Sequence, residues 1–139
     1  MLAKAYRIET ERLIIRCYQP EDAALLKASI DESLVHLLPW MTWAKNEPET
    51  VQAKIERLRQ YRGQFDLGLD YTFGIFSKDE KKLIGSTGLH TRLDGNAREI
   101  GYWINANCVQ QGYATETVKA LIKVGFEIEE LDRIEIRII

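Results

Sequence analysis

Apolar side chains recur along the chain with two periods, and these periods define the elements that we expect. Helical spacing predicts a helix that begins at Pro20, a second that begins at Pro48 and a third from Gly112 to Glu129. Alternation and short branched apolar runs predict strands at Arg12–Cys17, Asp70–Ser77, Lys82–Thr91, Arg98–Asn105 and Arg133–Ile139. The order β-α-α-β-β-β-α-β indicates a mixed α/β domain, with antiparallel hairpins in the middle and a parallel pair around the last helix.

Each predicted helix has an apolar stripe that we expect to face the core. The stripes consist of Ala24, Leu25, Ala28 and Leu34 in the first helix, Val51, Ile55, Leu58 and Phe65 in the second, and Val118, Leu121, Ile122, Gly125 and Phe126 in the third. The charged side chains of the second helix, Lys54 among them, fall mostly on its other faces. We therefore expect that charged face to be solvated.

The bulk composition limits the partners. A length of 139 residues suits a single domain spanning residues 1–139. The net charge is −2 and no basic block is present, so we expect neither a nucleic-acid nor a membrane partner. Cys17 and Cys108 are too few for a disulfide framework and indicate a reducing compartment. Because the first residues lack the apolar core of a signal peptide, and no apolar run approaches a membrane span, a cytoplasmic protein is expected.

The strongest sign of chemistry is a strand that runs through a short loop into a helix. The strand carries Glu99–Ile104 (EIGYWI), and the loop and helix start carry Gln110–Glu116 (QQGYATE). Such a junction points free backbone N–H groups and the positive end of the helix dipole at one place, where a phosphate group fits. The single Gly112 also suits an ordinary helix start, and neither a G-x-G-x-x-G fingerprint nor a P-loop is present.

Four segments in the right order resemble the GNAT N-acetyltransferases, in the branch that acetylates the N-termini of ribosomal proteins. They are Thr10–Arg16 (TERLIIR) with Pro20–Ala23 (PEDA), Leu34–Trp43 (LVHLLPWMTW), the strand–loop–helix junction, and Leu131–Arg137 (LDRIEIR). The resemblance implies the GNAT fold, with acetyl-CoA as co-substrate. It also implies an acceptor that is a primary amine, most specifically a ribosomal-protein N-terminus.

The resemblance assigns roles to residues of the junction. The pyrophosphate of acetyl-CoA would be held by backbone N–H groups of Gln111, Gly112, Tyr113, Ala114 and Thr115. The pantetheine arm would pair with the backbone of Trp103 and Ile104, where the family's two neighbouring strands splay apart. Main-chain donors read the shape of a phosphate, so side chains at these positions can vary.

Acyl transfer to an amine needs a proton acceptor, and Glu99 is the candidate general base. The alternative is an edge carboxylate paired with a basic side chain such as Arg98. Trp40 and Trp43 are candidates for the wall of the acceptor groove, with hydrophobic packing beside a helix end as the alternative. His36 and His90 have no carboxylate or cysteine partner at ligand spacing, so both are interpreted as structural and no metal site is expected.

Two departures from the family pattern shape the alternatives for function. Val109 stands where the loop usually has a polar residue, and Gln110 stands where this branch often has glycine. The family also continues past the last predicted strand with a further helix and strands, so we expect the domain to be truncated at its C-terminus. Besides protein N-terminal acetylation, a small-molecule amine acetyltransferase and a catalytically inactive CoA-binding module remain open. An exposed final strand makes a homodimer a further possibility.

Overall fold

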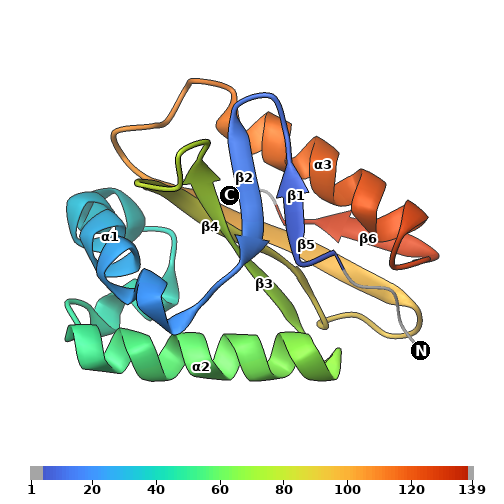
Figure 1. The fold of residues 1–139 in the computed structure, drawn as a ribbon, viewed down its shortest axis with the longest axis horizontal. Coiled ribbons are helices and arrows are strands. Elements are labelled where there is room, and N and C mark those ends of the chain that lie inside the picture. The colour runs from blue at the N-terminus through green and yellow to red at the C-terminus, as the bar shows by residue number, and fades with distance from the viewer. Residues whose placement is uncertain (1–4, 138–139) are drawn as a thin grey trace.

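This computed structural model describes residues 5–137, and their fold is built on a six-stranded sheet (Figure 1). Its strands are β1 (Arg7–Glu9), β2 (Leu13–Cys17), β3 (Tyr71–Ser77), β4 (Leu83–His90), β5 (Ala97–Ile104) and β6 (Arg133–Ile136). The helices are α1 (Ala23–Leu37), α2 (Val51–Leu67) and α3 (Tyr113–Glu127), with 3₁₀ turns η1 (Pro20–Asp22) and η2 (Thr42–Asn46). No helix in this range is long and apolar enough to span a membrane.

The strands lie in the sheet in chain order, and only the last pair is parallel. Strands β1 to β5 form successive antiparallel pairs, and α3 connects β5 to its parallel neighbour β6. The predicted element order is confirmed apart from β1, whose three residues are too few to show an alternating pattern. The first helix starts as the 3₁₀ turn η1, and the last two residues of the strand predicted at Arg133–Ile139 lie outside the described range.

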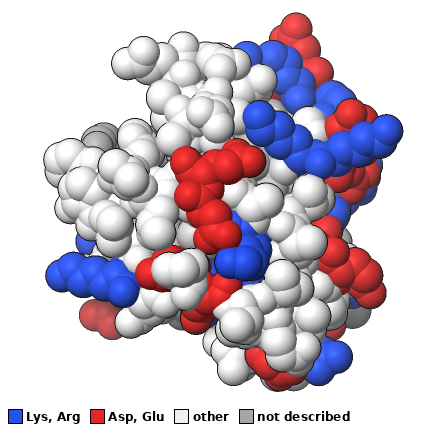
Figure 2. All heavy atoms as spheres, turned by 90° about the vertical axis from the view of Figure 1, so that its left-hand side faces the viewer, with Lys and Arg blue, Asp and Glu red and all other residues white. Residues whose placement is uncertain are grey.

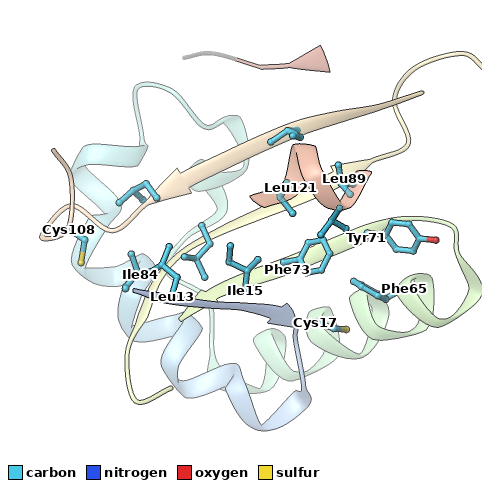
Figure 3. Packing of buried hydrophobic residues seen from close by; sticks show 14 residues of the cluster. Leu13, Ile15, Cys17, Phe65, Tyr71, Phe73, Ile84, Leu89, Cys108 and Leu121 are labelled. Atoms are coloured by element: carbon cyan, nitrogen blue, oxygen red, sulfur yellow. The ribbon is translucent and has the colours of Figure 1, made fainter. Parts of the chain in front are cut away.

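Both faces of the sheet are covered, because side chains along each strand point alternately to the two faces. One hydrophobic cluster packs between the sheet and α3, and Figure 3 shows Leu121 of α3 beside Leu89 and above Phe73 of the sheet. The other cluster packs between the sheet and the helices α1 and α2, and it includes Ile30, Leu58 and Trp103. The second face is where the candidate site lies.

The stripe predicted for α1 is wrong at two of its four positions, since Leu25 and Leu34 are partly buried and pack against the core. Ala24 and Ala28 are exposed, and the buried face instead consists of Ala23, Leu26, Ser29, Ile30, Ser33 and Leu37. Two serines belong to this face because their hydroxyl groups make hydrogen bonds to other parts of the chain, which satisfies them inside the protein. A stripe that contains polar residues cannot be recognised from hydrophobicity alone.

The solvated face predicted for α2 is also wrong at one position. Lys54 is 0% exposed, while Val51 of the predicted apolar stripe is 41% exposed. The helix therefore buries Lys54 together with Leu58 and Phe65. This lysine borders the candidate site described below.

The start of α2 is fixed by a side-chain cap. The Thr50 hydroxyl oxygen accepts a hydrogen bond of 3.1 Å from the N–H of Ala53. We expect T50A to lower the free energy of unfolding by about 1 kcal/mol, because one N–H of the first turn loses its acceptor. Urea unfolding measures the difference. T50S keeps the hydroxyl and should match the wild type, whereas equal losses in both variants would contradict this role.

Candidate active site

The loop that follows β5 is held by α1. Asn105 is fully buried, and its side-chain amide donates to Ser29 Oγ and to Glu32 Oε2, both at 2.9 Å. The next backbone N–H, that of Ala106, donates to Ser33 Oγ at 2.9 Å. The buried serines of α1 therefore fix the path of the chain between β5 and α3.

Beyond this anchor, the chain forms a phosphate-sized cradle at the start of α3. Gln110 and Gly112 both have positive φ values, 61° and 80°, which curl the backbone before the helix begins. The first bond of the helix runs from the N–H of Glu116 to the carbonyl of Gly112. Helix geometry leaves the N–H groups of residues 112–115 for an outside acceptor, and the helix dipole favours an anion there. We call residues 111–115 the cradle.

The Arg12 side chain binds both the cradle and the first turn of α3. Its Nη1 donates to the carbonyl oxygen of Gln111 at 2.8 Å, and its Nε donates to Glu116 Oε1 at 2.7 Å. The guanidinium also lies 4.4 Å from the centre of the Tyr113 ring. Thus one side chain from the start of β2 contacts the loop, the first residue of α3 and its first-turn carboxylate.

Glu116 completes this clamp. Its Oε2 accepts from the Thr10 hydroxyl at 2.5 Å and from the backbone N–H of Arg12 at 2.9 Å. Burial alone would raise the pKa of Glu116, but these hydrogen bonds and the Arg12 charge hold it below its usual value. The carboxylate is therefore ionised at neutral pH. The Thr10–Arg16 and Gly112–Glu116 segments, far apart in the sequence, meet at this pair.

Beside the cradle, one edge of β5 has no partner strand among residues 5–137. The N–H of Arg137 donates to the carbonyl of Ile100, and within the described residues β6 ends at Ile136. Since backbone groups of a strand alternate in direction, Tyr102 and Ile104 direct their N–H and C=O groups to this open edge. The Trp103 carbonyl points the other way, toward β4. A Cβ built on Gly85 of β4 would lie only 2.1 Å from the Trp103 carbonyl oxygen. The alternation therefore assigns the backbone positions on the open edge to Tyr102 and Ile104, rather than to Trp103 and Ile104.

A cleft of about 360 Å³ lies on the α1–α2 face of the sheet. Its floor includes Thr72, Ser86, Gly101 and Trp103, and its walls include Trp40, Trp43, Lys54, Arg57 and Tyr61. Trp43 packs against Trp103 with a centroid separation of 6.2 Å, while Trp40 is 62% exposed at the rim. The two predicted tryptophans thus both line one cleft. Figure 2, which looks onto the α1 side, shows acidic side chains gathered down the middle of that face, with basic atoms among them.

The wall of the cleft contains a buried ion cluster. The Lys54 ammonium contacts Glu47, whose side chain is 3% exposed, and Glu49 at 2.7 Å. Arg57 contacts Glu49 from the other side at 2.9 Å. The hydrogen bond from Lys54, reinforced by Arg57, holds the pKa of Glu49 below its usual value. The cluster ties the segment after η2, which carries Trp43, to α2.

Glu99 lies on the cleft side of β5, but the cleft wall beside it is formed by Arg92. Arg92 Nη1 donates to Glu99 Oε1 at 2.9 Å, and the Glu99 side chain is 20% exposed. The carboxylate therefore has a basic partner, although that partner is Arg92 rather than Arg98. Glu99 is also at the opposite end of β5 from the cradle.

The fold gives His90 a carboxylate partner that is not at ligand spacing along the chain. His90 Nδ1 lies 3.1 Å from Asp70 Oδ2, and both residues line the cleft. The β3–β4 register pairs Tyr71 with Leu89, so Asp70 stands directly opposite His90. A regular hairpin centred on the Lys78–Lys81 turn would pair Asp70 with Leu89. The register shift between Ile75 and Phe76 is what brings Asp70 opposite His90, so neither the turn nor ligand spacing along the chain reveals this pair. Among residues 5–137, no group of three or more His, Cys, Asp or Glu side chains is arranged to hold a metal ion.

The chain has relatives among known proteins. The family model described as "Acetyltransferase (GNAT) domain" matches residues 12–139. The uncharacterized N-acetyltransferase YoaA of Bacillus subtilis (strain 168) is 27% identical over 128 residues, 91% of this chain and 70% of that protein. The ribosomal protein uS5-alanine N-acetyltransferase of Escherichia coli (strain K12) is 27% identical over 133 residues, 92% of this chain and 67% of that protein.

The fold has solved counterparts. The ribosomal-protein-S5-alanine acetyltransferase from Vibrio fischeri aligns with a TM-score of 0.77 and 25% identity. The alignment covers 92% of this chain and 71% of that one. The predicted fold class is confirmed.

Proposed function

Because the chain belongs to the GNAT acetyltransferase family, we propose that it transfers the acetyl group of acetyl-CoA to a primary amine. The observation that carries this proposal is the cradle. Its backbone N–H groups and the start of α3 form an anion site immediately beside an open strand edge. A ligand with a pyrophosphate at one end and an amide-bearing arm at the other fits both features together.

In this arrangement Gln111, Gly112, Tyr113, Ala114 and Thr115 bind the pyrophosphate through their backbone. The pantetheine arm pairs with Tyr102 and Ile104 along the open edge of β5, and a backbone N–H there polarises the thioester carbonyl. Trp103 contributes its ring to the floor of the cleft. Glu99 is the carboxylate candidate for the proton acceptor.

The acceptor amine occupies the cleft, with Trp40 and Trp43 as its aromatic wall. We favour a protein N-terminus as the acceptor, and a ribosomal protein is the specific candidate because two of the proteins compared above carry that activity in their names. The Trp40 side of the cleft is exposed and could admit an extended chain end. Acidic side chains on the neighbouring α1 face attract a cationic acceptor.

Calorimetry with acetyl-CoA and a turnover assay that follows CoA thiol release test this proposal. The amine panel contains peptides that begin with alanine or serine, spermidine and kanamycin. We expect acetyl-CoA binding, and turnover with a peptide. Turnover with spermidine or kanamycin alone would show that the acceptor is a small-molecule amine and not a protein N-terminus. Binding of acetyl-CoA without any turnover would indicate a CoA-binding module.

A pair of glycine variants tests the cradle itself. Gly112 and Gly95 both have positive φ, 80° and 77°, so G112V and G95V strain the backbone to a similar degree. Only Gly112 belongs to the cradle, and a Cβ there would lie 3.3 Å from Arg12. We expect acetyl-CoA to bind about tenfold more weakly to G112V, and with wild-type affinity to G95V. Equal affinities in both variants would place the cofactor elsewhere.

A further inference from the structure

Asp70 and His90 form an oriented pair at the floor of the cleft. Asp70 precedes β3 and His90 ends β4, and the antiparallel register places them opposite each other. Asp70 Oδ2 lies 3.1 Å from His90 Nδ1, while Asp70 Oδ1 accepts the N–H of Thr91 at 2.9 Å. Both oxygens of the carboxylate are thus engaged, and its orientation is fixed by the backbone.

This contact determines which nitrogen of His90 carries the proton. Burial would raise the pKa of Asp70, but the hydrogen bonds from His90 and Thr91 and the charge of Arg98 hold it below its usual value. An ionised carboxylate can only accept hydrogen bonds, so Nδ1 must carry the hydrogen. In the neutral ring, the lone pair is then on Nε2.

Two glycines make room for the imidazole ring. A Cβ on Gly88 would lie 2.4 Å from His90 Cε1 and 2.6 Å from Nε2, so the ring lies across this glycine. Gly101 is paired with Gly88 on the neighbouring strand, and a Cβ there would lie 3.8 Å from His90 Cδ2. Because Gly101 and His90 both line the cleft, the ring is positioned at its floor.

We propose that His90 Nε2 is the proton acceptor for the attacking amine, with Asp70 as its positioning residue. This inference rests on the acetyltransferase function proposed above. Glu99 stands directly opposite His90 in the β4–β5 register, but its carboxylate is bonded to Arg92. The imidazole has its lone pair available, and imidazole is the side chain most suited to accept a proton near neutral pH.

The proton balance of the step is complete. The acceptor arrives as an ammonium, and Nε2 takes one proton from it and passes that proton to solvent. The freed nitrogen attacks the thioester carbonyl carbon, so that an N–C bond forms. The C–S bond then breaks, its electron pair leaves on sulfur, and the second proton of the nitrogen ends on the thiolate.

Several charged side chains near the His90 imidazole would influence how the reaction rate depends on pH. They are Asp70 before β3, Arg92 after β4, Arg98 and Glu99 on β5, and Arg137 after β6. Two of these charges are already paired with each other, since Arg92 binds Glu99. The carboxylate in contact with the ring is Asp70.

Turnover of H90Q with a panel amine that the wild type acetylates tests the proposal. We expect kcat to fall by about 10²-fold or more, since general base catalysis contributes factors of that size, while the acetyl-CoA Kd stays unchanged. The matched control is H36Q, which replaces an exposed histidine on α1 outside the cleft and should retain full activity. In H90A, added imidazole should restore part of the rate, a response that a purely structural role would not give.

The outcomes separate this proposal from the function on which it rests. If the wild type is active and H90Q retains its kcat, His90 is not the base and the acetyltransferase function stands. A larger loss in E99Q than in H90Q would assign the base to Glu99. A wild type that binds acetyl-CoA but acetylates no amine overturns both proposals.

A measurement without turnover tests the same arrangement. Nitrogen-15 NMR of the histidine rings should show His90 protonated at Nδ1 and unprotonated at Nε2 in its neutral form. The D70N variant should lose this tautomer preference, and its pH–rate profile should shift relative to the wild type. A ring protonated at Nε2 in the wild type would overturn the proposal.

Discussion

The K54M variant is expected to lose about 3–5 kcal/mol of unfolding free energy, the cost of removing one partner from a buried ion pair. Lys54 is 0% exposed, and Glu47 beside it has a 3% exposed side chain. Methionine fills much of the same space but leaves the Glu47 carboxylate buried without its cation. Urea unfolding followed by circular dichroism measures the loss.

Two comparisons make this prediction specific. K54M/E47Q removes the unpaired charge, so it should be more stable than K54M alone. K27M breaks the exposed pair of Lys27 with Asp31 on α1, where the lysine side chain is 28% exposed, and should cost only about 0.5 kcal/mol. If K54M lost no more stability than K27M, the cluster would not support the fold.

Loss of the Lys54 cluster should also affect the wall of the cleft. Glu47 directly follows η2, and η2 carries Trp43, so the Lys54 cluster fixes the aromatic wall relative to α2. Where K54M remains folded, the acceptor KM should rise more than the acetyl-CoA Kd. The cradle makes no contact with this cluster through the bonds described, so it should be affected less than the cleft wall.

The parts of the structure that could be predicted from the sequence depend on local patterns. The strand–loop–helix junction is contiguous, so its strand, Gly112 and α3 are recognisable from residues within a short window. Element order follows for the same reason, since each strand and helix has its own period. Lys54 and the serines Ser29 and Ser33 were missed because their burial depends on partners far away in the chain.

In the candidate site, too, the features formed by contiguous residues could be predicted from the sequence, and the long-range contacts could not. Backbone positions of the cradle follow from the loop itself, whereas the Arg12–Glu116 and Asp70–His90 contacts join segments that only the folded sheet brings together. The direction of the Trp103 backbone groups can be assigned only from the strand register, which periodicity alone does not give. Glu99 was found from its position on the strand, but its Arg92 partner lies in a turn whose path no pattern predicts.

The R12A variant is expected to weaken acetyl-CoA binding tenfold or more, because charged hydrogen bonds of about 1.5–3 kcal/mol are lost behind the cradle. Without Arg12, the carbonyl of Gln111 loses its donor and Glu116 loses its counter-charge. An unbalanced carboxylate in the first turn of α3 then repels the pyrophosphate. Calorimetry with acetyl-CoA measures the loss, which should grow as the salt concentration falls.

Three variants separate the geometry of the Arg12 clamp from its charge. R12K keeps the cation but cannot hold Gln111 and Glu116 at once in the planar geometry of a guanidinium, so it should bind between R12A and the wild type. R12A/E116Q removes the repulsive carboxylate and should regain part of the affinity. R7A removes an arginine of similar exposure on β1, paired with Glu9 and Glu80, and should leave binding unchanged. Wild-type affinity in R12A, or an equal loss in R7A, would show that Arg12 does not hold the cradle in its binding form.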